Sequence, residues 1–374
     1  MVEWKKLGEV CKLERGVRVV KKNLKEEGLI PVYQNSLTPL GYYDKSNYPE
    51  HTCFVICAGA AGEVGFSNKA FWAADDCTCV VCPPLIHSTF IYYYLMENQH
   101  LLKTQVRKAS VPRLSKDVIG KLLLPIPSLS EQQRIVSILD TFTSSISNLK
   151  QQIEERRKQY EYERDLLLDL EGKDEKDIHS WGESCEIKKG NGVQKADFVE
   201  EGIGCIHYGQ IYTYYGAYTY TTNKFVAKET FEKAKKASKG DIIMTDTSEN
   251  VEDICKSVAY LGEDDIAVSN HALILKHHQN PLFLSFSTQT NSFLTQKRKV
   301  VVGAKVSCIK PEHFAQIKIY LPSLEEQSRI VSILDTFEQS ISNLEEQLAM
   351  REKQYEYYRN QLLTFEGEEE RGKT

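Results

Sequence analysis

The chain has 374 residues, of which 41% are hydrophobic, and a formal net charge of −5. This length and composition exclude wholesale disorder, and we expect two globular units with connections between them. No apolar run reaches the roughly 20 residues that a membrane span requires, and the N-terminus lacks the apolar stretch of a signal peptide. We therefore expect a soluble, cytoplasmic protein with no membrane partner, whose ten cysteines are reduced thiols.

The negative charge is concentrated in two segments. Residues 1–126 hold 16 Lys/Arg against 12 Asp/Glu, and residues 178–321 hold 17 against 16, which gives net charges of +4 and +1. Residues 127–177 hold 8 against 12, and residues 322–374 hold 6 against 12, for −4 and −6. The whole-chain charge therefore does not argue against a nucleic-acid partner.

The first domain, residues 1–126, is expected to mix short strands with a few helices. Apolar runs at 53–58 and 77–82 are typical of strands, and residues 90–102 of a helix. The glycines of 58–65 favour a turn over a phosphate-binding loop, because they are loosely placed and no helix start follows them.

Five cysteines of this domain deserve a separate interpretation: Cys53, Cys57, Cys77, Cys79 and Cys82. In principle they offer four thiolates to zinc. However, the last three fall on one predicted strand, whose side chains alternate between faces and cannot all converge. We favour buried small hydrophobes over a zinc site, and expect neither a metal nor a cofactor.

Two groups of side chains in the first domain are candidates for DNA contact. The basic group can anchor phosphates, and its arginines can read guanine edges. In the other group, amides can read adenine edges and tyrosines can contact phosphates or sugars. The alternatives are a solvated basic surface and tyrosines that pack within a β-rich core. The candidates are Arg107, Lys108 and Arg113, and then Gln34, Asn35, Tyr42 and Tyr43.

A long helix is predicted over residues 127–172. Ser128 and Glu131 form the sequence signature of a capping box, in which the serine accepts from a first-turn amide and the glutamate reaches back to the cap. Neither proline nor glycine follows Pro127 until Gly172. Apolar residues then alternate steps of four and three, which specifies a coiled-coil seam. The seam positions are Ile135, Leu139, Phe142, Ile146, Leu149 and Ile153.

The polar segment 173–180 is expected to link this helix to a second domain, residues 181–321. Strands are predicted at 240–245 and 271–276. The second domain carries the same two kinds of DNA-contact candidate. These are His207, Tyr208, Gln210, Tyr212, Tyr214 and Tyr215 in a tyrosine-rich stretch, and the basic residues Lys297, Arg298, Lys299 and Lys305.

A second long helix, residues 322–367, is an internal repeat of the first. The two segments are identical at 31 of 46 positions, including the capping signature. The second seam consists of Ile330, Leu334, Phe337, Ile341, Leu344 and Leu348. Matched length and spacing favour pairing of the two helices with each other over docking of each on its own domain. Residues 368–374 are expected to form a disordered tail.

An arginine occupies the same core-type position in both helices, Arg156 and Arg351. It can fix the register through a carboxylate on the partner helix, or its stem can pass the seam and place the charge in water. The domains repeat more loosely. Residues 8–16 match 182–190, and residues 107–115 align with 299–307, which sets Arg107 and Arg113 opposite Lys299 and Lys305.

The motif P-S-L-x-E-Q-x-R-I-V-x-I-L-D, which occurs twice before a heptad helix, resembles the conserved regions of type I restriction–modification specificity subunits. The resemblance implies a non-catalytic α+β protein of two target recognition domains. Its two long helices would form an antiparallel intramolecular coiled coil with pseudo-twofold symmetry. It also implies that each domain recognises one half of a bipartite double-stranded DNA sequence. Two methyltransferase subunits, and restriction subunits with them, would assemble on the helices.

No catalytic motif is recognisable in the sequence. An Asn/Asp-Pro-Pro-aromatic methyltransferase motif and a G-x-x-x-x-G-K-[ST] loop are both missing. A stand-alone DNA-modifying enzyme is therefore disfavoured. A coiled-coil adaptor whose domains bind proteins is the other rival, and sequence-dependent DNA binding in the presence of a methyltransferase subunit separates it from the specificity subunit.

Overall fold

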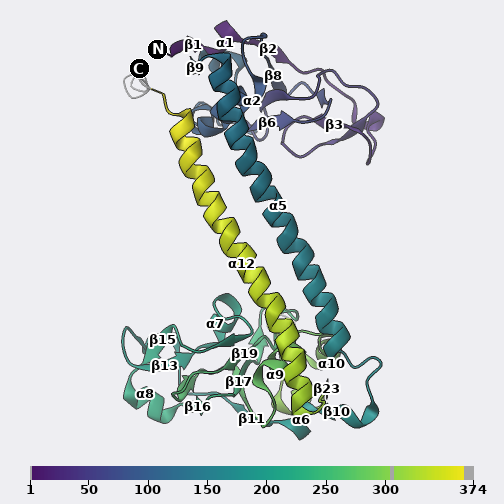
Figure 1. The fold of residues 1–374 in the computed structure, drawn as a ribbon, viewed down its shortest axis with the longest axis vertical. Helices are drawn as coiled ribbons and strands as arrows, with labels where there is room; N and C mark the ends of the chain where they lie inside the picture. The colour runs from purple at the N-terminus through teal and green to yellow at the C-terminus, as the bar shows by residue number, and fades with distance from the viewer. Residues whose placement is uncertain (1, 304–306, 366–374) are drawn as a thin grey trace. The chain divides into compact units, whose positions relative to one another are not determined.

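The computed structural model describes residues 2–303 and 307–365, which divide into two compact units (Figure 1). Unit 1 comprises residues 1–151 and 346–374, and unit 2 comprises residues 152–345. Each unit thus contains one globular α+β domain together with parts of two long helices, α5 (Leu129–Leu168) and α12 (Leu324–Leu363). The predicted fold class is confirmed.

The main sheet of the domain of unit 1 is the four-stranded antiparallel sheet β2-β8-β5-β6, and two smaller sheets accompany it. The strands and helices of the whole domain have the following bounds. Its strands are β1 (Glu3–Lys6), β2 (Lys12–Arg15), β3 (Ile30–Tyr33), β4 (Gly41–Tyr43), β5 (Thr52–Ile56), β6 (Val64–Ser67), β7 (Trp72–Ala73), β8 (Cys77–Val81) and β9 (Leu123–Ile126). Its helices are α1 (Leu7–Val10), η1 (Lys21–Asn23), α2 (Ser88–Glu97), α3 (Gln99–Thr104) and α4 (Lys116–Lys121). The sheets are β2-β8-β5-β6, β4-β3-β7 and β1-β9. The helix expected at 90–102 is interrupted at Asn98.

The domain of unit 2 has two five-stranded sheets, β11-β21-β17-β19-β14 and β12-β15-β13-β20-β16, and the pairs β10-β23 and β18-β22. Its strands are β10 (Ile178–Ser180), β11 (Glu186–Lys189), β12 (Phe198–Val199), β13 (Ile203–Ile206), β14 (Tyr218–Thr219), β15 (Lys224–Val226), β16 (Lys235–Ala237), β17 (Ile242–Thr245), β18 (Thr247–Ser248), β19 (Ser257–Tyr260), β20 (Ile266–Val268), β21 (Ala272–Lys276), β22 (Ser307–Cys308) and β23 (Lys318–Tyr320). Its helices are η2 (Glu175–Asp177), α6 (Trp181–Ser184), η3 (Lys195–Asp197), α7 (Tyr208–Thr213), α8 (Lys228–Lys233), α9 (Pro281–Ser287), α10 (Asn291–Val300) and α11 (Pro311–Phe314).

The two domains share one topology. The order β2-β8-β5-β6 recurs as β11-β21-β17-β19, and β4-β3-β7 recurs as β15-β13-β20. The glycine that follows the first strand of each main sheet is required for the same reason in both. A Cβ on Gly16 would lie 2.1 Å from the carbonyl oxygen of Ala74, and one on Gly190 would lie 2.3 Å from that of Ser269. The predicted match of 8–16 with 182–190 is therefore structural.

The segment 173–180 is less of a linker than its composition suggests. Its last three residues form β10, which pairs antiparallel with β23. The chain therefore enters the fold of unit 2 at Ile178, whereas the polar composition alone placed the domain start at 181.

Both long helices span 40 residues and lie within their predicted ranges. The first-turn amides of Glu131 and Glu326 donate to Ser128 and Ser323, as expected of a cap. The glutamate side chains do not reach back to the cap. Each binds the arginine three residues later bidentately, as in the Glu131–Arg134 pair at 2.7 and 2.8 Å. The seam positions are buried or half-buried along both helices.

The helices pair antiparallel within each unit (Figure 1). In unit 1, Phe142 stacks on Tyr358 with ring centroids 5.3 Å apart, and Lys150 forms an ion pair with Glu352. In unit 2, Tyr160 packs against Phe337. Equivalent positions of the two helices are 195 residues apart, so Lys150 corresponds to Glu345 and Glu352 to Arg157. The Arg157–Glu345 ion pair of unit 2 therefore matches the unit 1 pair with the charges exchanged between the two repeat positions.

Among the described residues, neither core-type arginine forms an ion pair with a carboxylate across the seam. The Arg156 guanidinium lies over the Phe337 ring at 5.7 Å, and Arg351 lies over Phe142 at the same distance. Cation–π contact is the reason that these positions tolerate arginine. Within the described residues, no helix is long and apolar enough to cross a membrane.

Candidate nucleic-acid interface

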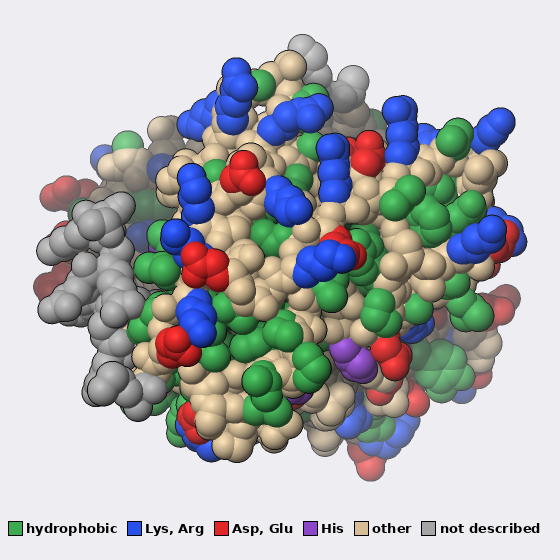
Figure 2. Space-filling view, turned by 90° about the horizontal axis from the view of Figure 1, so that it is seen from above, with side chains coloured by type: hydrophobic (Ala, Val, Ile, Leu, Met, Phe, Trp, Pro, Cys, Tyr) green, Lys and Arg blue, Asp and Glu red, His purple; other side chains and the backbone are tan. Residues whose placement is uncertain are grey.

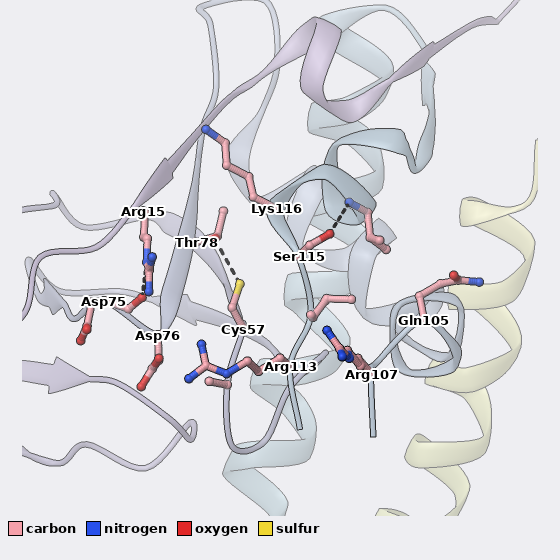
Figure 3. A pocket seen from close by; sticks show the side chains of 13 residues that line it. Arg15, Cys57, Asp75, Asp76, Thr78, Gln105, Arg107, Arg113, Ser115 and Lys116 are labelled. Carbon is pink, nitrogen blue, oxygen red and sulfur yellow. Dashed lines mark hydrogen bonds between the residues drawn. The ribbon is translucent and has the colours of Figure 1, made fainter. Parts of the chain in front are cut away.

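A cleft in unit 1 is lined by Arg107 and Arg113, two of the three basic candidates predicted in this domain (Figure 3). The third, Lys108, is exposed and is not part of the lining. Its cavity has a volume of about 490 Å³. Cys57, Thr78 and Leu114 form part of its wall, and the polar side chains stand around them. These polar residues are Arg15, Asp75, Asp76, Gln105, Arg107, Arg113, Ser115 and Lys116.

Backbone hydrogen bonds hold the loop that carries Arg107 and Arg113. The two residues exchange amide–carbonyl bonds of 2.8 and 3.2 Å, which close the loop at its base. The amide of Leu114 donates to the carbonyl of Cys57 at 2.9 Å, and so attaches the loop to the end of β5. The loop thus presents exposed side chains from a fixed base, an arrangement that suits recognition.

The charge of the cleft suits a polyanion. The lining holds four cationic side chains and two carboxylates, so it has two positive charges in excess; these residues are Arg15, Arg107, Arg113 and Lys116, and Asp75 and Asp76. Figure 2 shows that lysine and arginine side chains gather over one face of this unit. Such a surface attracts phosphates and supplies the donors that read guanine.

The amide candidates of unit 1 lie beside the cleft. Gln34 donates to the Asp76 carboxylate at 3.3 Å, and the carbonyl of Asn35 accepts from Ala60 in the turn after β5. Tyr42 and Tyr43 belong to β4 and are half-buried, and the Tyr43 ring packs edge-on against Trp72. The structure therefore brings Gln34 and Asn35 to the basic loop, whereas Tyr42 and Tyr43 lie on β4, where Tyr43 packs against Trp72.

Unit 2 has different side chains at the equivalent points. Asp246 follows β17 as Cys57 follows β5. The Asp246 amide donates to the carbonyl of His271, which precedes the neighbouring strand β21, and the Cys57 amide donates to that of Asp76, which precedes β8. The Asp246 carboxylate is buried, binds Lys189 at 2.8 Å and accepts from the Thr247 hydroxyl at 2.8 Å. Lys189 occupies the position of Arg15 at the end of the first sheet strand.

The loop of unit 2 corrects the predicted alignment of the basic segments. Val302 and Cys308 exchange amide–carbonyl bonds of 3.0 and 2.8 Å, as Arg107 and Arg113 do. The amide of Ile309 then donates to the Asp246 carbonyl, as Leu114 does to Cys57. Residues 107–115 therefore correspond to 302–310 and not to 299–307, because α10 is longer than its counterpart α3.

Three of the four basic candidates of unit 2, Lys297, Arg298 and Lys299, consequently lie in α10, before the loop base. Lys297 is 2% exposed, and its ammonium donates to the carbonyls of Glu252 and Ile254, so this predicted DNA contact is a core residue. Arg298 and Lys299 are exposed in the last turn of α10, where cations also complement the helix dipole. Lys305 lies outside the described residues.

The tyrosine-rich stretch of unit 2 forms helix α7, the loop after it and the short strand β14. The side chain of His207 caps the helix by accepting from the Gly209 amide, and burial lowers the pKa of His207. The Tyr208 ring packs against His271 with centroids 5.4 Å apart. This contact places α7 beside His271, which lies 3.8 Å from the Asp246 carboxylate. In unit 1, Gln34 likewise contacts Asp76, the equivalent of His271.

The remaining candidates of this stretch differ in exposure. Tyr212 is half-buried and donates to the Thr247 carbonyl, and Tyr215 is buried with its hydroxyl bonded to Asn223. Gln210 also binds Asn223, and Tyr214 is 64% exposed. Tyr208, Tyr212 and Tyr214 therefore stay candidates for contact, whereas Tyr215 stabilises the fold.

Cysteine side chains contribute to the cores. Cys53, Cys77 and Cys79 are fully buried, and burial raises their thiol pKa values. Cys77 and Cys79 pack in one apolar cluster and Cys53 in another. This distribution follows from strand alternation and matches the interpretation as small hydrophobes.

Sequence reasoning missed Arg15, Lys116, Lys189, Asp246 and His271. The signal for Arg15 and Lys189 was present, since each is the basic residue before the shared glycine of the aligned segments. His271 has a left-handed backbone with φ of 64°, which a histidine rarely adopts and which sequence spacing does not reveal.

Comparisons with known proteins agree on one family. A family model described as the type I restriction modification DNA specificity domain matches residues 1–156 and 175–350. A putative type I restriction enzyme specificity subunit of Haemophilus influenzae is 27% identical over 97% of this chain and 96% of its own length. A type I restriction enzyme specificity subunit of Escherichia coli is also 27% identical, over 97% and 94%. The S subunit of M. genitalium shares the fold, with a TM-score of 0.64 at 18% identity over 97% of both chains.

Proposed function

The chain belongs to the family of type I restriction–modification specificity subunits, and we propose that each of its units reads one half of a bipartite DNA sequence. The family gives the chain a DNA-specificity role within a type I complex. The assignment of that role to particular surfaces is our proposal. It makes the chain a recognition scaffold that does no chemistry by itself.

One observation carries the assignment of the reading surfaces. The repeated fold places side chains at equivalent points in each unit: Arg15 and Lys189 end the first sheet strand, Cys57 and Asp246 follow β5 and β17, and Asp76 and His271 precede β8 and β21. A closed loop lies at a fourth equivalent point. Conserved backbone with changed side chains is what two readers of different half-sites require. In unit 1 the loop supplies arginines, and in unit 2 an acidic and histidine-containing cluster replaces them.

The exposed faces of the long helices supply the docking sites for two methyltransferase subunits. Seam packing accounts for identity at buried positions but not for Tyr162 and Tyr357, which are identical between the copies and 67% and 61% exposed. Tyr162 belongs to unit 2 and Tyr357 to unit 1, so each unit offers one such face. Exposed tyrosines are typical anchors of protein interfaces. The restriction subunits join through the same assembly.

The paired helices set the gap between the two half-sites. Removal of the same whole number of heptads from both helices is expected to change the gap and to leave the bases of each half-site unchanged. Methylation-sensitive sequencing reports both properties, and altered half-site bases would contradict this role of the helices.

Co-expression with candidate methyltransferase subunits tests the proposed function. Mapping of methylated adenines across the genome should then give a bipartite motif with a fixed gap. The purified chain alone, incubated with DNA and the methyl donor, should give no methylation. A continuous motif, or a motif that does not depend on this chain, would overturn the proposal.

A further inference from the structure

A fully buried glutamine lies in the first turn of each long helix. Gln132 and Gln327 are both 0% exposed, and they occupy the same position of the repeat. The residues on their C-terminal side, Gln133 and Ser328, differ and are exposed. The coiled-coil seam begins three residues later and does not need a polar side chain at this point. The identity of the two glutamines therefore has another cause.

Each glutamine joins its long helix to the helix that packs on the domain's sheet. The Gln132 carbonyl oxygen accepts from the backbone amide of His87 at 2.8 Å, and Gln327 accepts from that of Asn280 at 3.0 Å. His87 is the N-cap residue of α2, and Asn280 is the N-cap residue of α9. In both units the glutamine therefore accepts from the N-cap residue of the helix that packs on the sheet.

The amide nitrogen of each glutamine completes the connection. Gln132 donates to the carbonyls of Pro127 and Leu85, at 3.0 and 3.3 Å. Gln327 donates to the carbonyl of Pro322 at 2.9 Å and to the Gln279 side chain at 2.8 Å. The side-chain amide of each glutamine thus binds three groups, which belong to the segment before its own helix and to the segment before α2 or α9. Buried hydrogen bonds of this kind are directional and costly to break.

We propose that Gln132 and Gln327 are positioning residues, which fix the direction in which each reading domain leaves its long helix. Neither residue contacts DNA in this proposal. They act through α2 and α9, whose apolar faces belong to the domain cores. The inference rests on the proposed function, because a fixed direction matters only if the helices set the gap between half-sites.

The substitutions Gln132→Met and Gln327→Met test the proposal, singly and together. Methionine keeps the volume of glutamine and removes its hydrogen bonds, so the domain can turn against its helix. The assay uses the complex of the full chain with its methyltransferase subunits. Its DNA duplexes carry both half-sites at the native gap, and at gaps one and two base pairs longer or shorter.

The measured quantity is the ratio of methylation rates at the native gap and at altered gaps. In the double variant this ratio is expected to fall by about tenfold, since lost buried hydrogen bonds would no longer oppose the altered geometry. The half-site bases should stay unchanged. If a methionine variant does not fold, Gln132→Glu, which keeps the acceptor for the His87 amide, replaces it with the same expected direction.

The matched controls are Phe71→Leu in unit 1 and Val258→Ala in unit 2. Both residues are fully buried in clusters that include neither long helix, so these variants lose stability without touching the glutamines. They should keep the native gap ratio. A ratio that stays native in the glutamine variants, or falls equally in the controls, would overturn the inference. An unaltered complex without any gap preference would instead contradict the proposed function.

Discussion

Cys57 and Asp246 occupy the same position in the two units, directly after β5 and β17, yet they create different surroundings. Cys57 lines a cleft whose charged groups include three arginines. Asp246 is a buried carboxylate that holds Lys189 and lies beside His271. The long helices differ far less between copies. The comparison teaches that this chain varies its recognition surfaces while it keeps the elements that carry them.

The largest expected effect is on the arginine loop. Arg107→Ala with Arg113→Ala should lower the affinity of the complex for its cognate duplex by about two orders of magnitude, since each base-reading arginine contributes about 1–3 kcal/mol. Fluorescence anisotropy at fixed salt measures this loss. The matched control is Val302→Ala with Cys308→Ala at the equivalent loop base of unit 2, which should bind nearly as the unaltered chain does. Equal losses in both variants would remove the proposed difference between the loops.

The buried carboxylate of unit 2 should matter more than the thiol of unit 1. Asp246→Ala removes the charged partner of Lys189 and the acceptor of Thr247, at a cost of about 2–3 kcal/mol in the free energy of unfolding. Cys57→Ala should cost about 1 kcal/mol, because it removes the contacts of one small side chain and its hydrogen bond with Thr78. Urea unfolding compares the two. A smaller loss for Asp246→Ala would mean that the ion pair is not a stabilising part of the cluster.

A second difference between the units is a half-buried carboxylate, Glu338, that makes the stability of unit 2 depend on pH. Burial raises the pKa of Glu338 to about 6, while Tyr160 donates to its carboxylate. The equivalent residue of unit 1 is Thr143. Because the folded-state pKa is raised, the contribution of Glu338 to stability is complete below its ordinary pKa of about 4.5 and is lost as the pH rises through 6.

Glu338→Gln should therefore stabilise the chain by about 1–2 kcal/mol at pH 7.5 and leave its stability nearly unchanged at pH 4.5. The glutamine retains an acceptor for Tyr160. Thermal unfolding at the two pH values provides the measurement, and Thr143→Ala serves as the control without a pH-dependent difference. A stabilisation that is equal at both pH values would show that ionisation of Glu338 is not its cause.

The smallest expected effect concerns the exchanged ion pairs between the helices. Lys150→Glu should destabilise the chain by about 0.5 kcal/mol, since Lys150 and Glu352 are both exposed. Adding Glu352→Lys should restore the loss, because it re-creates the charge order of Arg157 and Glu345. A double-mutant cycle by urea unfolding measures the coupling. Failure of the second change to restore stability would contradict direct pairing of these side chains.

The helices and the domain plan were predictable from sequence because they depend on local periodicity and duplication. A 3.5-residue apolar spacing specifies a seam whatever lies around it. The cation–π role of Arg156 and Arg351 was not predictable, since the Phe337 and Phe142 rings come from the other helix. The sequence shows that Gln132 and Gln327 are identical between the two copies, but their burial depends on the domain against which each helix starts.

The recognition surfaces were less accessible to sequence reasoning. The sequence placed Lys297 on a basic surface, yet its side chain is buried and its ammonium donates to the carbonyls of Glu252 and Ile254. The alignment of the two basic segments failed by three residues because α10 is extended, and the backbone bonds of Val302, Cys308 and Ile309 reveal the correct match. Long-range pairings of this kind leave no local periodicity in the sequence.

Separate reading of the two half-sites is the central claim, and one measurement tests it most directly. Methylated adenines are mapped in cells that express the complex with Arg107→Ala and Arg113→Ala together, and in cells with His271→Ala. The first variant should relax the bases of one half-site only, and the second should relax only the other, with the gap unchanged in both. Relaxation of both halves by either variant, or of the same half by both, would contradict the account.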